Sequence, residues 1–292
     1  SLETNLATTD IDEESRIIKI GQAEIKEKRG ASQENPDSGG SQALKLLHKL
    51  VPEFTKTHPS TRTFTNITKI DIKSCYANIM RDYPLPCGSE ERLTDPQIIE
   101  QKIKEEQEGF VRFYLRQTAT IKKQQIPFLP DYHNEIKANL RGCFILYSKL
   151  FRAFQKHYKI RGKIVYTDFW MFAKKKGCVN PYLDYCQELK LQDEKKGKKL
   201  ANVLYGVLGR NQRIGYVYHP FHLAVNHLAI LQTYYLYRQF KPEQVLAIRS
   251  DCIYVRGELP DKLLIERKKY HISQFQKITL ANQDTLFIHD TQ

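Results

Sequence analysis

The sequence has no run of about 18 apolar residues, so it offers no helix long enough to cross a membrane. Its amino end lacks the charged-then-apolar pattern of a secretory signal. None of the six cysteines stands in a Cys-x-x-Cys pair, which argues against a zinc ribbon. We therefore expect reduced thiols in an intracellular protein (cytoplasm, nucleoid or organelle matrix) that is not secreted.

Internal repeats are also absent, and the 292 residues suffice for one large domain or two modest ones. The net charge is +13 but is unevenly spread. Residues 1–44 carry nine acidic and five basic side chains, a net of −4, so the rest of the chain carries +17. A strongly basic body favours a polyanionic partner, above all nucleic acid. The alternative is that the lysines only keep the surface solvated.

Hydrophobic periodicity predicts a mixture of helices and strands. Residues 1–44 are polar and rich in glycine and serine over residues 30–40, which predicts a loose segment. The pattern predicts strands over residues 68–72, 109–121 and 163–169, helices over 74–81, 94–108, 140–158, 179–189, 195–208 and 222–240, and a hairpin with arms 244–248 and 252–255. Thr94 is the expected N-cap of the second helix, with Pro96 in its first turn. Without strict strand–helix alternation, the predicted fold class is α+β.

The first motif, Lys-Ile-Asp-Ile-Lys-Ser-Cys-Tyr-Ala-Asn-Ile-Met at residues 69–80, places one carboxylate near the end of an apolar strand. Asp71 is a hard oxygen ligand of the kind that Mg²⁺ takes, one or two per site beside substrate phosphates and water. The helix start that follows, with Ser74 and Tyr76, offers backbone amides to phosphate oxygens. Alternatively, Asp71 only caps that helix.

The second motif, Lys-Lys-Leu-Ala-Asn-Val-Leu-Tyr-Gly at residues 198–206, places three functional side chains on one face of an expected helix. Lys198, Asn202 and Tyr205 stand at i, i+4 and i+7, within about 60° of arc. They offer an ammonium for phosphate, an amide for hydrogen bonds and an aromatic plate for a base, which suits a nucleotide. The alternative is an ordinary surface helix with solvated lysines.

The third motif, Val-Leu-Ala-Ile-Arg-Ser-Asp-Cys-Ile-Tyr-Val at residues 245–255, has two β-rich arms around a polar tripeptide. The tripeptide puts Asp251 at or near the tip of a hairpin. If this hairpin pairs beside the strand that carries Asp71, the two carboxylates can hold two metal ions about 4 Å apart for an in-line phosphoryl displacement. Otherwise Asp251 is a turn residue.

Together and in this order, the three motifs resemble those of family B DNA polymerases, closest to the protein-primed branch of phages and linear plasmids. The first is similar to the family's Asp-x-x-Ser-Leu-Tyr-Pro segment, and Tyr-Pro-Leu-Pro-x-Gly follows it at residues 83–88. The second is similar to Lys-x-x-x-Asn-Ser-x-Tyr-Gly and the third to Asp-Thr-Asp-Ser. The resemblance covers roughly residues 65–260.

The resemblance implies a right-hand polymerase, with a palm of antiparallel sheet and helices, helical fingers and a reduced thumb. It implies template-directed DNA synthesis, in which a primer 3′ hydroxyl takes a nucleotide from a dNTP with Mg²⁺ or Mn²⁺ as cofactor. The implied partners are DNA primer-template, dNTPs, and a terminal (priming) protein or a further polymerase subunit. No membrane is expected among them.

The same resemblance implies roles for individual residues. Tyr76 lies beneath the incoming sugar and rejects a 2′-hydroxyl, Lys198 contacts the triphosphate, and Tyr205 lines the nascent base pair. Lys190 is a candidate for a second phosphate contact. The implied catalytic and metal-binding residues are Asp71 and Asp251; the nucleotide-binding residues are Ser74, Tyr76, Lys190, Lys198, Asn202 and Tyr205; and the nucleic-acid-binding residues are Gly206, Arg249, Lys268, Lys269 and Lys277.

The implied division of the chain follows the motifs. Residues 1–44 are an acidic, flexible segment, 45–88 and 212–262 the two parts of the palm, 89–165 an insertion that contacts the priming protein, 166–211 the fingers and 263–292 a reduced thumb. No Asp-x-Glu in a strand context precedes the first motif, so we expect the proofreading exonuclease to be lacking. Lys268-Lys269-Tyr270 fits the letters of the family's Lys-x-Tyr primer motif, and Lys277 is the other candidate.

Several positions depart from the family pattern: Val203 stands for the serine of the second motif, Ala77 for the proline of the first, and one further departure bears on the metals. Arg249 stands where the family has the first hairpin aspartate. Replacing a negative by a positive side chain changes the local charge by two units, which predicts weaker binding of the metal ions. Arg249 could instead hold a primer phosphate. Two other functions therefore stay open: a polymerase-like module that has lost catalysis and binds nucleic acid or a partner, and an unrelated basic nucleic-acid-binding protein.

Overall fold

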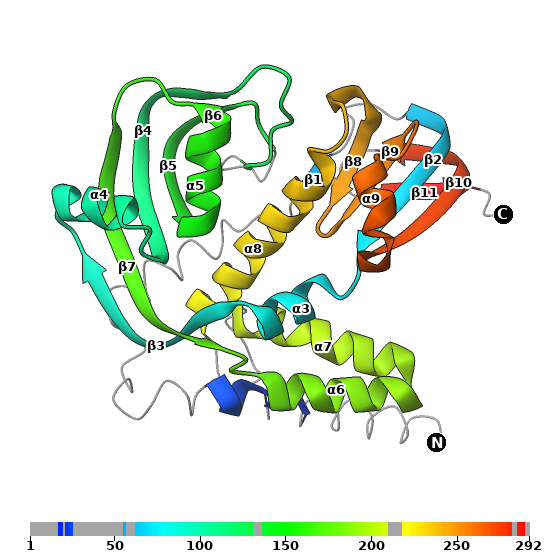
Figure 1. The fold of residues 1–292 in the computed structure, drawn as a ribbon, viewed down its shortest axis with the longest axis horizontal. Coiled ribbons are helices and arrows are strands. Elements are labelled where there is room, and N and C mark those ends of the chain that lie inside the picture. Colours follow the sequence, from blue (N-terminus) through cyan, green and yellow to red (C-terminus); the bar gives the residue numbers. More distant parts are fainter. Residues whose placement is uncertain are drawn as a thin grey trace.

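The computed structural model of the chain describes residues 17–19, 21–25, 55–56, 62–130, 136–209, 218–281 and 285–289. These residues form two antiparallel sheets that stand on either side of one long helix, with a helical hairpin below them (Figure 1). No helix in the described ranges is long and apolar enough to span a membrane. Most of the segment that the sequence predicts to be loose, including residues 30–40, lies outside the described residues.

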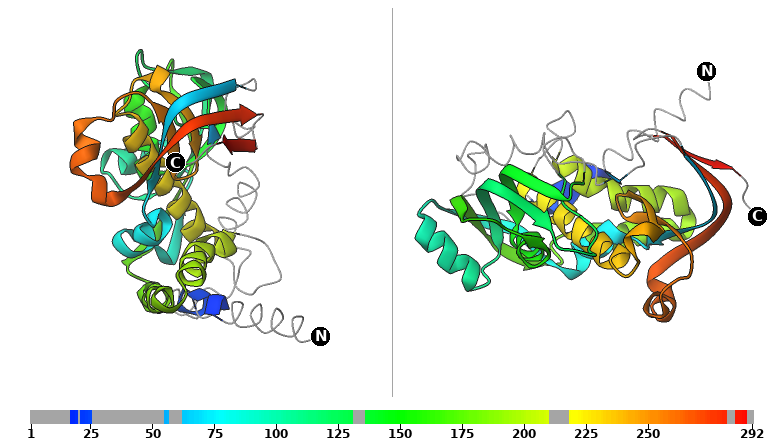
Figure 2. Two further views of the ribbon diagram at one scale, coloured as in Figure 1. Left: turned by 90° about the vertical axis from the view of Figure 1, so that its right-hand side faces the viewer. Right: turned by 90° about the horizontal axis from the view of Figure 1, so that it is seen from above.

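The first sheet, which we call the palm sheet, has six strands in the order β1-β8-β9-β2-β10-β11. Its strands are β1 (Thr55–Lys56), β2 (Arg62–Ile72), β8 (Val245–Arg249), β9 (Cys252–Arg256), β10 (Tyr270–Ala281) and β11 (Thr285–His289). The predicted hairpin is confirmed, because β8 and β9 pair antiparallel with Arg249 opposite Cys252. Strand β2 lies between β9 and β10, which places the first motif at the centre of the sheet. Figure 2 shows β2 and β10 curving together away from the rest of the molecule.

The two faces of the palm sheet have different surroundings, because successive side chains of a strand point to opposite faces. Ile70 of β2 and Ile253 of β9, which pair with each other, are fully buried in the main core. That core includes the carboxyl-terminal half of α8 (His219–Tyr237), a helix that is buried on nearly all sides. Lys69 and Asp71 therefore project from the opposite face of the sheet.

The second sheet, which we call the insertion sheet, has the strand order β3-β7-β4-β5, with the short β6 pairing to β4. Its strands are β3 (Pro84–Leu93), β4 (Gly109–Ile121), β5 (Asn139–Tyr147), β6 (Tyr158–Lys159) and β7 (Ile164–Lys176). Helices α4 (Pro96–Lys104) and α5 (Ser148–His157) contribute Ile99 and Phe151 to the core over Phe113 of β4. Residues 164–171 pair with β4 and residues 169–176 with β3, so residues 166–176, which were predicted to begin the fingers, belong to this sheet.

Two local predictions were wrong. The single helix predicted for residues 140–158 is a strand, β5, followed directly by α5. Leu146, Leu150 and Phe154 have helical spacing in the sequence, but the first of them is still in the strand. The predicted N-cap was also misplaced by one residue, since the Asp95 carboxylate accepts hydrogen bonds from Gln97 N at 2.8 Å and Ile98 N at 3.3 Å.

Below the two sheets, α6 (Asn180–Gln192) and α7 (Glu194–Gly209) form a helical hairpin (Figure 1). The helices approach closely at Gly197, where an added Cβ would lie 2.5 Å from Lys190 N and 2.6 Å from the Cys186 carbonyl oxygen. The short α3 (Cys75–Asp82) packs between this hairpin and α8, and Arg81 joins it to Asp184 of α6 at 2.7 Å. The fold is thus α+β with antiparallel sheets, which confirms the predicted fold class.

The residues after β9 continue the palm sheet. They form α9 (Asp261–Ile265), a 3-10 turn (Arg267–Lys269), β10 and β11. Strand β10 pairs with β2 from Tyr270, opposite Ile72, to Leu280, opposite Arg62. The residues implied to be a reduced thumb therefore begin as an integral strand of the sheet that carries Asp71.

Candidate active site

Two carboxylates from distant parts of the chain meet at one end of the palm sheet. Strand β2 carries Asp71 one residue before its end, and Asp251 lies in the two-residue loop between β8 and β9. The Ile72 amide donates to the Asp251 carbonyl oxygen at 3.0 Å, and Asp71 pairs with Cys252, the residue that follows Asp251. The sheet register therefore brings the first and third motifs side by side.

The tip of the hairpin is held in a defined conformation. Ser250 has φ of 49°, in the left-handed region that few residues other than glycine adopt readily. Its carbonyl oxygen accepts a hydrogen bond from Thr233 Oγ1 of α8 at 3.0 Å. Since Thr233 is fully buried, the loop is anchored both to α8 and to the end of β2, which restricts where Asp251 can lie.

The two acidic groups influence each other electrostatically. Burial and the neighbouring Asp71 charge raise the pKa of Asp251 from 3.8 to about 6, against the opposing effect of Lys69 and Lys198. Lys69 Nζ lies 3.9 Å from an Asp71 carboxylate oxygen. Because Asp71 and Asp251 repel each other when both are ionised, keeping both charged costs free energy. A bound divalent cation would offset this repulsion.

The raised pKa of Asp251 predicts how the stability of the metal-free chain depends on pH. Because the folded state holds the Asp251 proton more tightly than the unfolded chain does, its contribution to stability is present below pH 3.8 and is lost as pH rises through about 6. Asp251→Asn should therefore raise the free energy of unfolding by about 2 kcal/mol at pH 8, after allowance for solvent screening. At pH 4 the two proteins should differ little. Urea titrations in the presence of a chelator measure both values, and an equal gain at both pH values would show that ionisation of Asp251 is not the cause.

The donor set suits a hard divalent cation. In the described part of the chain no group of three or more His, Cys, Asp or Glu side chains is arranged to hold a metal ion, so the protein offers the carboxylate pair. Mg²⁺ is typically bound by one or two carboxylates together with substrate phosphates and water. The pair Asp71 and Asp251 fits that mode, and not that of a closed structural metal site.

Helix α3 starts immediately beyond Asp71 with an open amino end. Ser74 precedes the helix in the left-handed conformation, φ 49° and ψ 39°, and its side chain makes no capping hydrogen bond. The first-turn amides of a helix need an external acceptor, and a phosphate oxygen is a suitable one. Tyr76, in the first turn, is half-buried, and its pKa is raised by burial, by Tyr205 and by Asp251.

Helix α7 brings the second motif against the first. The Tyr205 ring stacks on the Tyr76 ring with centroids 4.2 Å apart and planes 8° apart. Lys198 is exposed and close enough to Asp251 to lower the pKa of that carboxyl group. Asn202, which lies along α7 between Lys198 and Tyr205, is half-buried. A Cβ at Gly206 would meet nothing within 4 Å, so the helix surface beside Tyr205 is open. Lys198 and Tyr76 thus lie near Asp251, and Tyr205 packs against Tyr76.

The remaining predicted lysines lie at different distances from this centre. Lys269 is at the same end of the sheet, since its carbonyl accepts from Lys73 N at 3.0 Å and Tyr270 pairs with Ile72. Lys268 is adjacent and exposed. Lys277 pairs with Thr65 and is about 20 Å along β10. Of the two candidates for the primer motif, the Lys268–Lys269 stretch is the one beside Asp71. Lys190 lies at the carboxyl end of α6, against Gly197.

Arg249 lies on the same face of the palm sheet as Asp71, because both residues pair with Cys252 of the strand between them. Two strand spacings separate them, about 10 Å. The opposing cationic effects on the pKa of Asp251 come from Lys69 and Lys198, whereas Arg249 acts on Cys252. Arg249 is therefore a neighbour of the carboxylate pair on the same face of the sheet.

Two residues of the site were missed by sequence reasoning. Lys69 stands two positions before Asp71, and the strand period of two would have placed both side chains on one face. His222 of α8 stacks on Tyr205 with ring centroids 5.6 Å apart. No signal in the sequence joins His222 to Tyr205, because their contact depends on how α7 and α8 pack.

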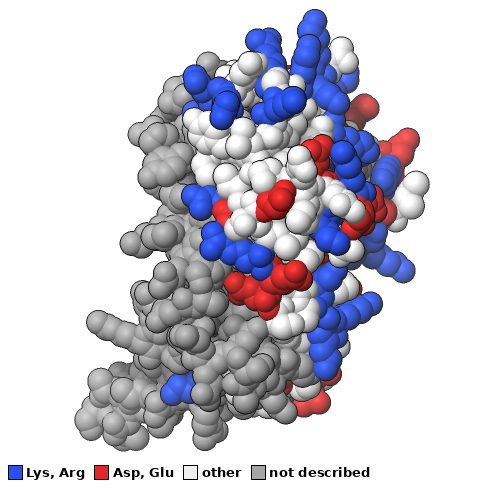
Figure 3. All heavy atoms as spheres, turned by 90° about the vertical axis from the view of Figure 1, so that its left-hand side faces the viewer, with Lys and Arg blue, Asp and Glu red and all other residues white. Residues whose placement is uncertain are grey.

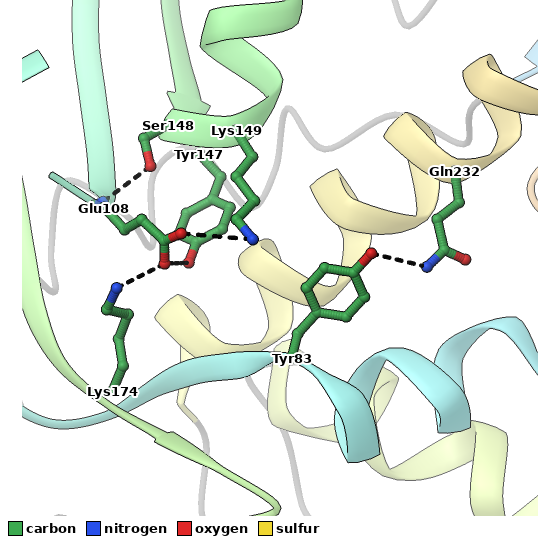
Figure 4. A network of polar contacts seen from close by, with 8 residues as sticks. Tyr83, Glu108, Tyr147, Ser148, Lys149, Lys174 and Gln232 are labelled. Atoms are coloured by element: carbon green, nitrogen blue, oxygen red, sulfur yellow. Dashed lines mark hydrogen bonds and ion pairs between the residues drawn. The ribbon is translucent and has the colours of Figure 1, made fainter. Parts of the chain in front are cut away.

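A polar network links α3 to α8 and the insertion sheet (Figure 4). Cys75 Sγ donates to Gln232 Oε1 at 3.5 Å, and Gln232 Nε2 donates to the Tyr83 hydroxyl at 3.5 Å. The Lys149 ammonium lies 4.9 Å from the centre of the Tyr83 ring and 3.5 Å from Glu108. The short helix that carries Tyr76 is therefore held at both ends by contacts with Gln232 of α8.

Glu108 is the centre of the other half of this network. Its carboxylate also contacts Lys174 Nζ at 2.6 Å and accepts from the Tyr147 hydroxyl at 3.3 Å. Burial favours the neutral acid, but the two lysines outweigh it and the pKa of Glu108 is lowered. Strands β4, β5 and β7 and helix α5 are thus joined at the base of the insertion sheet, where it meets α8.

The structure thus combines an antiparallel sheet, with one carboxylate on a central strand and one in the loop of a hairpin, and a helical hairpin that carries Tyr205. A family model described as DNA polymerase type B, organellar and viral, matches residues 55–213, more than half of the chain, and the chain belongs to this family. The family predicted from the three motifs is therefore confirmed. Asp251 lies beyond the matched residues, so its assignment rests on the pairing of β2 with β9.

Solved structures of Phi29 DNA polymerase share the fold. The complex with primer-template DNA is 17% identical with a TM-score of 0.65, covering 84% of this chain and 49% of that one. The complex with primer-template DNA and incoming nucleotide is 17% identical with a TM-score of 0.65, covering 85% of this chain and 50% of that one. The complex with single-stranded DNA is 16% identical with a TM-score of 0.60, covering 84% of this chain and 49% of that one. This chain thus spans about half the length of those proteins. No curated protein matches its sequence.

Proposed function

We propose that this chain carries out template-directed DNA synthesis, transferring a nucleotide from a dNTP to a primer 3′ hydroxyl by a two-metal mechanism. The observation that carries the proposal is the pairing of β2 with the β8–β9 hairpin, which sets Asp71 beside Asp251. These two carboxylates would hold Mg²⁺ or Mn²⁺, as family B polymerases do with divalent metals. When bound, the ions would supply charge stabilisation at the attacking and leaving oxygens.

The chain's own residues would bind and orient the nucleotide. The first-turn amides of α3 near Ser74 and the Lys198 ammonium would hold the triphosphate, with Lys190 as a second, more distant base. The Tyr76 ring would lie beneath the sugar and leave no space for a 2′-hydroxyl. Tyr205 and Asn202 would line the nascent base pair, since they share the face of α7 that contacts Tyr76.

The remaining charged surface would contact nucleic acid. The candidates are Gly206 on α7, Arg249 two strands from Asp71, Lys268 and Lys269 at the end of the sheet that carries Asp71, and Lys277 further along β10. The described residues 109–130 and 136–167 contain twelve lysines and arginines and no acidic residue. On the side of the molecule seen in Figure 3, Lys and Arg gather along the upper edge. This insertion surface would meet a terminal protein, a further subunit or the DNA itself.

Primer extension tests the proposal directly. The chain is incubated with a labelled primer-template, the four dNTPs and either Mg²⁺ or Mn²⁺, and a parallel reaction contains a chelator. We expect extension with either metal and none with the chelator. A chain that shifts the labelled DNA in a gel but extends it with neither metal would overturn the proposal of synthesis.

A second candidate is a polymerase-like module that has lost catalysis and binds nucleic acid or a partner. The specific observation in its favour is Arg249, a cation on the face of the palm sheet that carries Asp71, at a position where the family motif has an aspartate. If the charges are separated by about the two strand spacings of 10 Å, the repulsion between this cation and a bound metal ion is moderate, on the order of 1 kcal/mol per unit charge. Such a term weakens metal binding without abolishing it, which is why synthesis remains the preferred function.

Replacing Arg249 by aspartate should strengthen metal binding. We expect the Mg²⁺ concentration that gives half-maximal extension to fall about three- to tenfold, because two charge units change at a distance where screening is partial. Arg256, the exposed last residue of β9, provides the matched control Arg256→Asp, which makes the same change of charge further from the carboxylates. An equal fall in both variants would show that the effect is general and not local to the carboxylate pair.

A further inference from the structure

His222 contacts the aromatic side chain that faces the proposed nucleotide site. The Tyr205 ring has two near-parallel ring neighbours, Tyr76 at 4.2 Å and His222 at 5.6 Å, with interplanar angles of 8° and 7°. The three rings come from α3, α7 and α8. A ring that stacks on two others from separate helices has little freedom to tilt.

The same histidine also holds the backbone of Tyr205. His222 Nδ1 lies 2.7 Å from the Tyr205 carbonyl oxygen. A carbonyl oxygen can only accept, so Nδ1 carries the proton and donates it. The bond is made near the carboxyl end of α7, where histidine side chains favourably meet helix carbonyls. One side chain therefore contacts both the ring and the main chain of Tyr205.

The residues packed around the His222 ring restrict its movement. His222 is only 7% exposed, and a Cβ added at Gly209 would overlap its ring. The Tyr218 amide donates to the Leu208 carbonyl at 2.8 Å, which ties the start of α8 to the end of α7. The glycine at the end of α7 is thus what allows the ring of His222 to lie against that helix.

We propose that His222 is a positioning residue that holds Tyr205 and, through the ring stack, Tyr76, and so sets how strongly the site prefers a deoxyribonucleotide to a ribonucleotide. The inference rests on the proposed function, in which Tyr76 excludes the 2′-hydroxyl. If the support from His222 is lost, Tyr205 can tilt and Tyr76 gains room to move away from the sugar. A 2′-hydroxyl then meets less resistance, while the triphosphate contacts are unchanged.

Two substitutions separate the two contacts of His222. His222→Phe keeps a ring for the stack and removes the donor, whereas His222→Asn keeps a donor and removes the ring. The measurement is the ratio of the dissociation constants of a ribonucleoside and a deoxyribonucleoside triphosphate for the chain on primer-template, with Ca²⁺ so that the nucleotide is not consumed. We expect His222→Asn to lower this preference about two- to tenfold, the range of one stacked aromatic contact, and His222→Phe to lower it less.

His227 provides the matched control. It is another buried histidine of α8, but its Nδ1 accepts from the Tyr147 amide at 3.0 Å, next to the insertion sheet. His227→Asn should lower the melting temperature and leave the nucleotide preference unchanged, because a loss of stability alone does not alter a ratio of affinities. A preference that is unchanged in His222→Asn, or equally lowered in His227→Asn, would overturn the role of His222.

Primer extension on the same samples distinguishes this inference from the proposed function. A native chain that prefers deoxyribonucleotides but extends no primer would contradict DNA synthesis, and a lowered preference in His222→Asn would still support the role of His222. A native chain that extends primers but binds both kinds of nucleotide equally would support synthesis and contradict the role of His222.

Discussion

Replacing either Asp71 or Asp251 by asparagine is expected to lower the rate of primer extension by about 10³-fold or more. Each carboxylate would share in holding the metal ions, and loss of about 4 kcal/mol of transition-state stabilisation corresponds to that factor. Asparagine keeps the size and the hydrogen-bonding shape of the side chain, so the β2–β9 pairing should survive. The rate is measured by rapid single-nucleotide addition at saturating dNTP and Mg²⁺.

The control for this experiment is Asp82→Asn, an exposed aspartate at the end of α3, on the same short helix as Tyr76. It should extend primers at the native rate. DNA binding in gel shifts should be close to native in all three variants, because the basic surface is untouched. Extension that persists at more than about a tenth of the native rate in both Asp71→Asn and Asp251→Asn would show that the pair does not hold the catalytic metals.

Replacing Gly109 by alanine is expected to have the largest effect on stability. A Cβ at this position would overlap the Trp170 carbonyl oxygen and lie 3.0 Å from the Phe169 ring, and a backbone atom cannot move aside as a flexible side chain can. Strands β4 and β7 would have to separate where Gly109 pairs with Met171. We expect the free energy of unfolding to fall by about 3 kcal/mol or more, measured by urea titration.

A second glycine gives the opposite expectation. Gly206 lies in α7, and a Cβ there would meet nothing within 4 Å, so Gly206→Ala should raise stability by about 0.5 to 1 kcal/mol through its helix propensity. If Gly109→Ala were as stable as the native chain, the close approach of β4 to β7 at Trp170 would be wrong. The comparison depends only on unfolding and not on whether the chain synthesises DNA.

The sequence predicted the elements around the three motifs well because each is a short, self-contained pattern. An apolar strand ending near Asp71, a β-rich hairpin with Asp251 in its loop and a helix carrying Lys198 to Tyr205 are all set by local periodicity. The meeting of the two aspartates could be stated only as a condition. The structure supplies the register, through β2 against β9, that meets this condition.

Predictions failed where neighbouring elements run into each other without a break. Residues 140–158 contain no proline and only one glycine, at position 142, so nothing in the sequence marks the change from strand to helix at Ser148. The role of β10 was missed for a different reason. Its partner β2 is far away in the chain, and tertiary pairing over such a separation leaves no local signal.

The strand order of the palm sheet has a consequence for how the molecule assembles. The insertion sheet is built from one continuous stretch of chain, from β3 to β7, within which the most distant pairing joins Pro84 to Lys176. In the palm sheet, β2 pairs with β9 and β10, which follow it in the chain only after the insertion sheet and helices α6 to α8. Contacts between distant segments carry a larger entropy of loop closure and form slowly. We therefore expect the carboxylate pair to form late in folding, and a chain whose second half is missing or unfolded would carry Asp71 without Asp251 beside it.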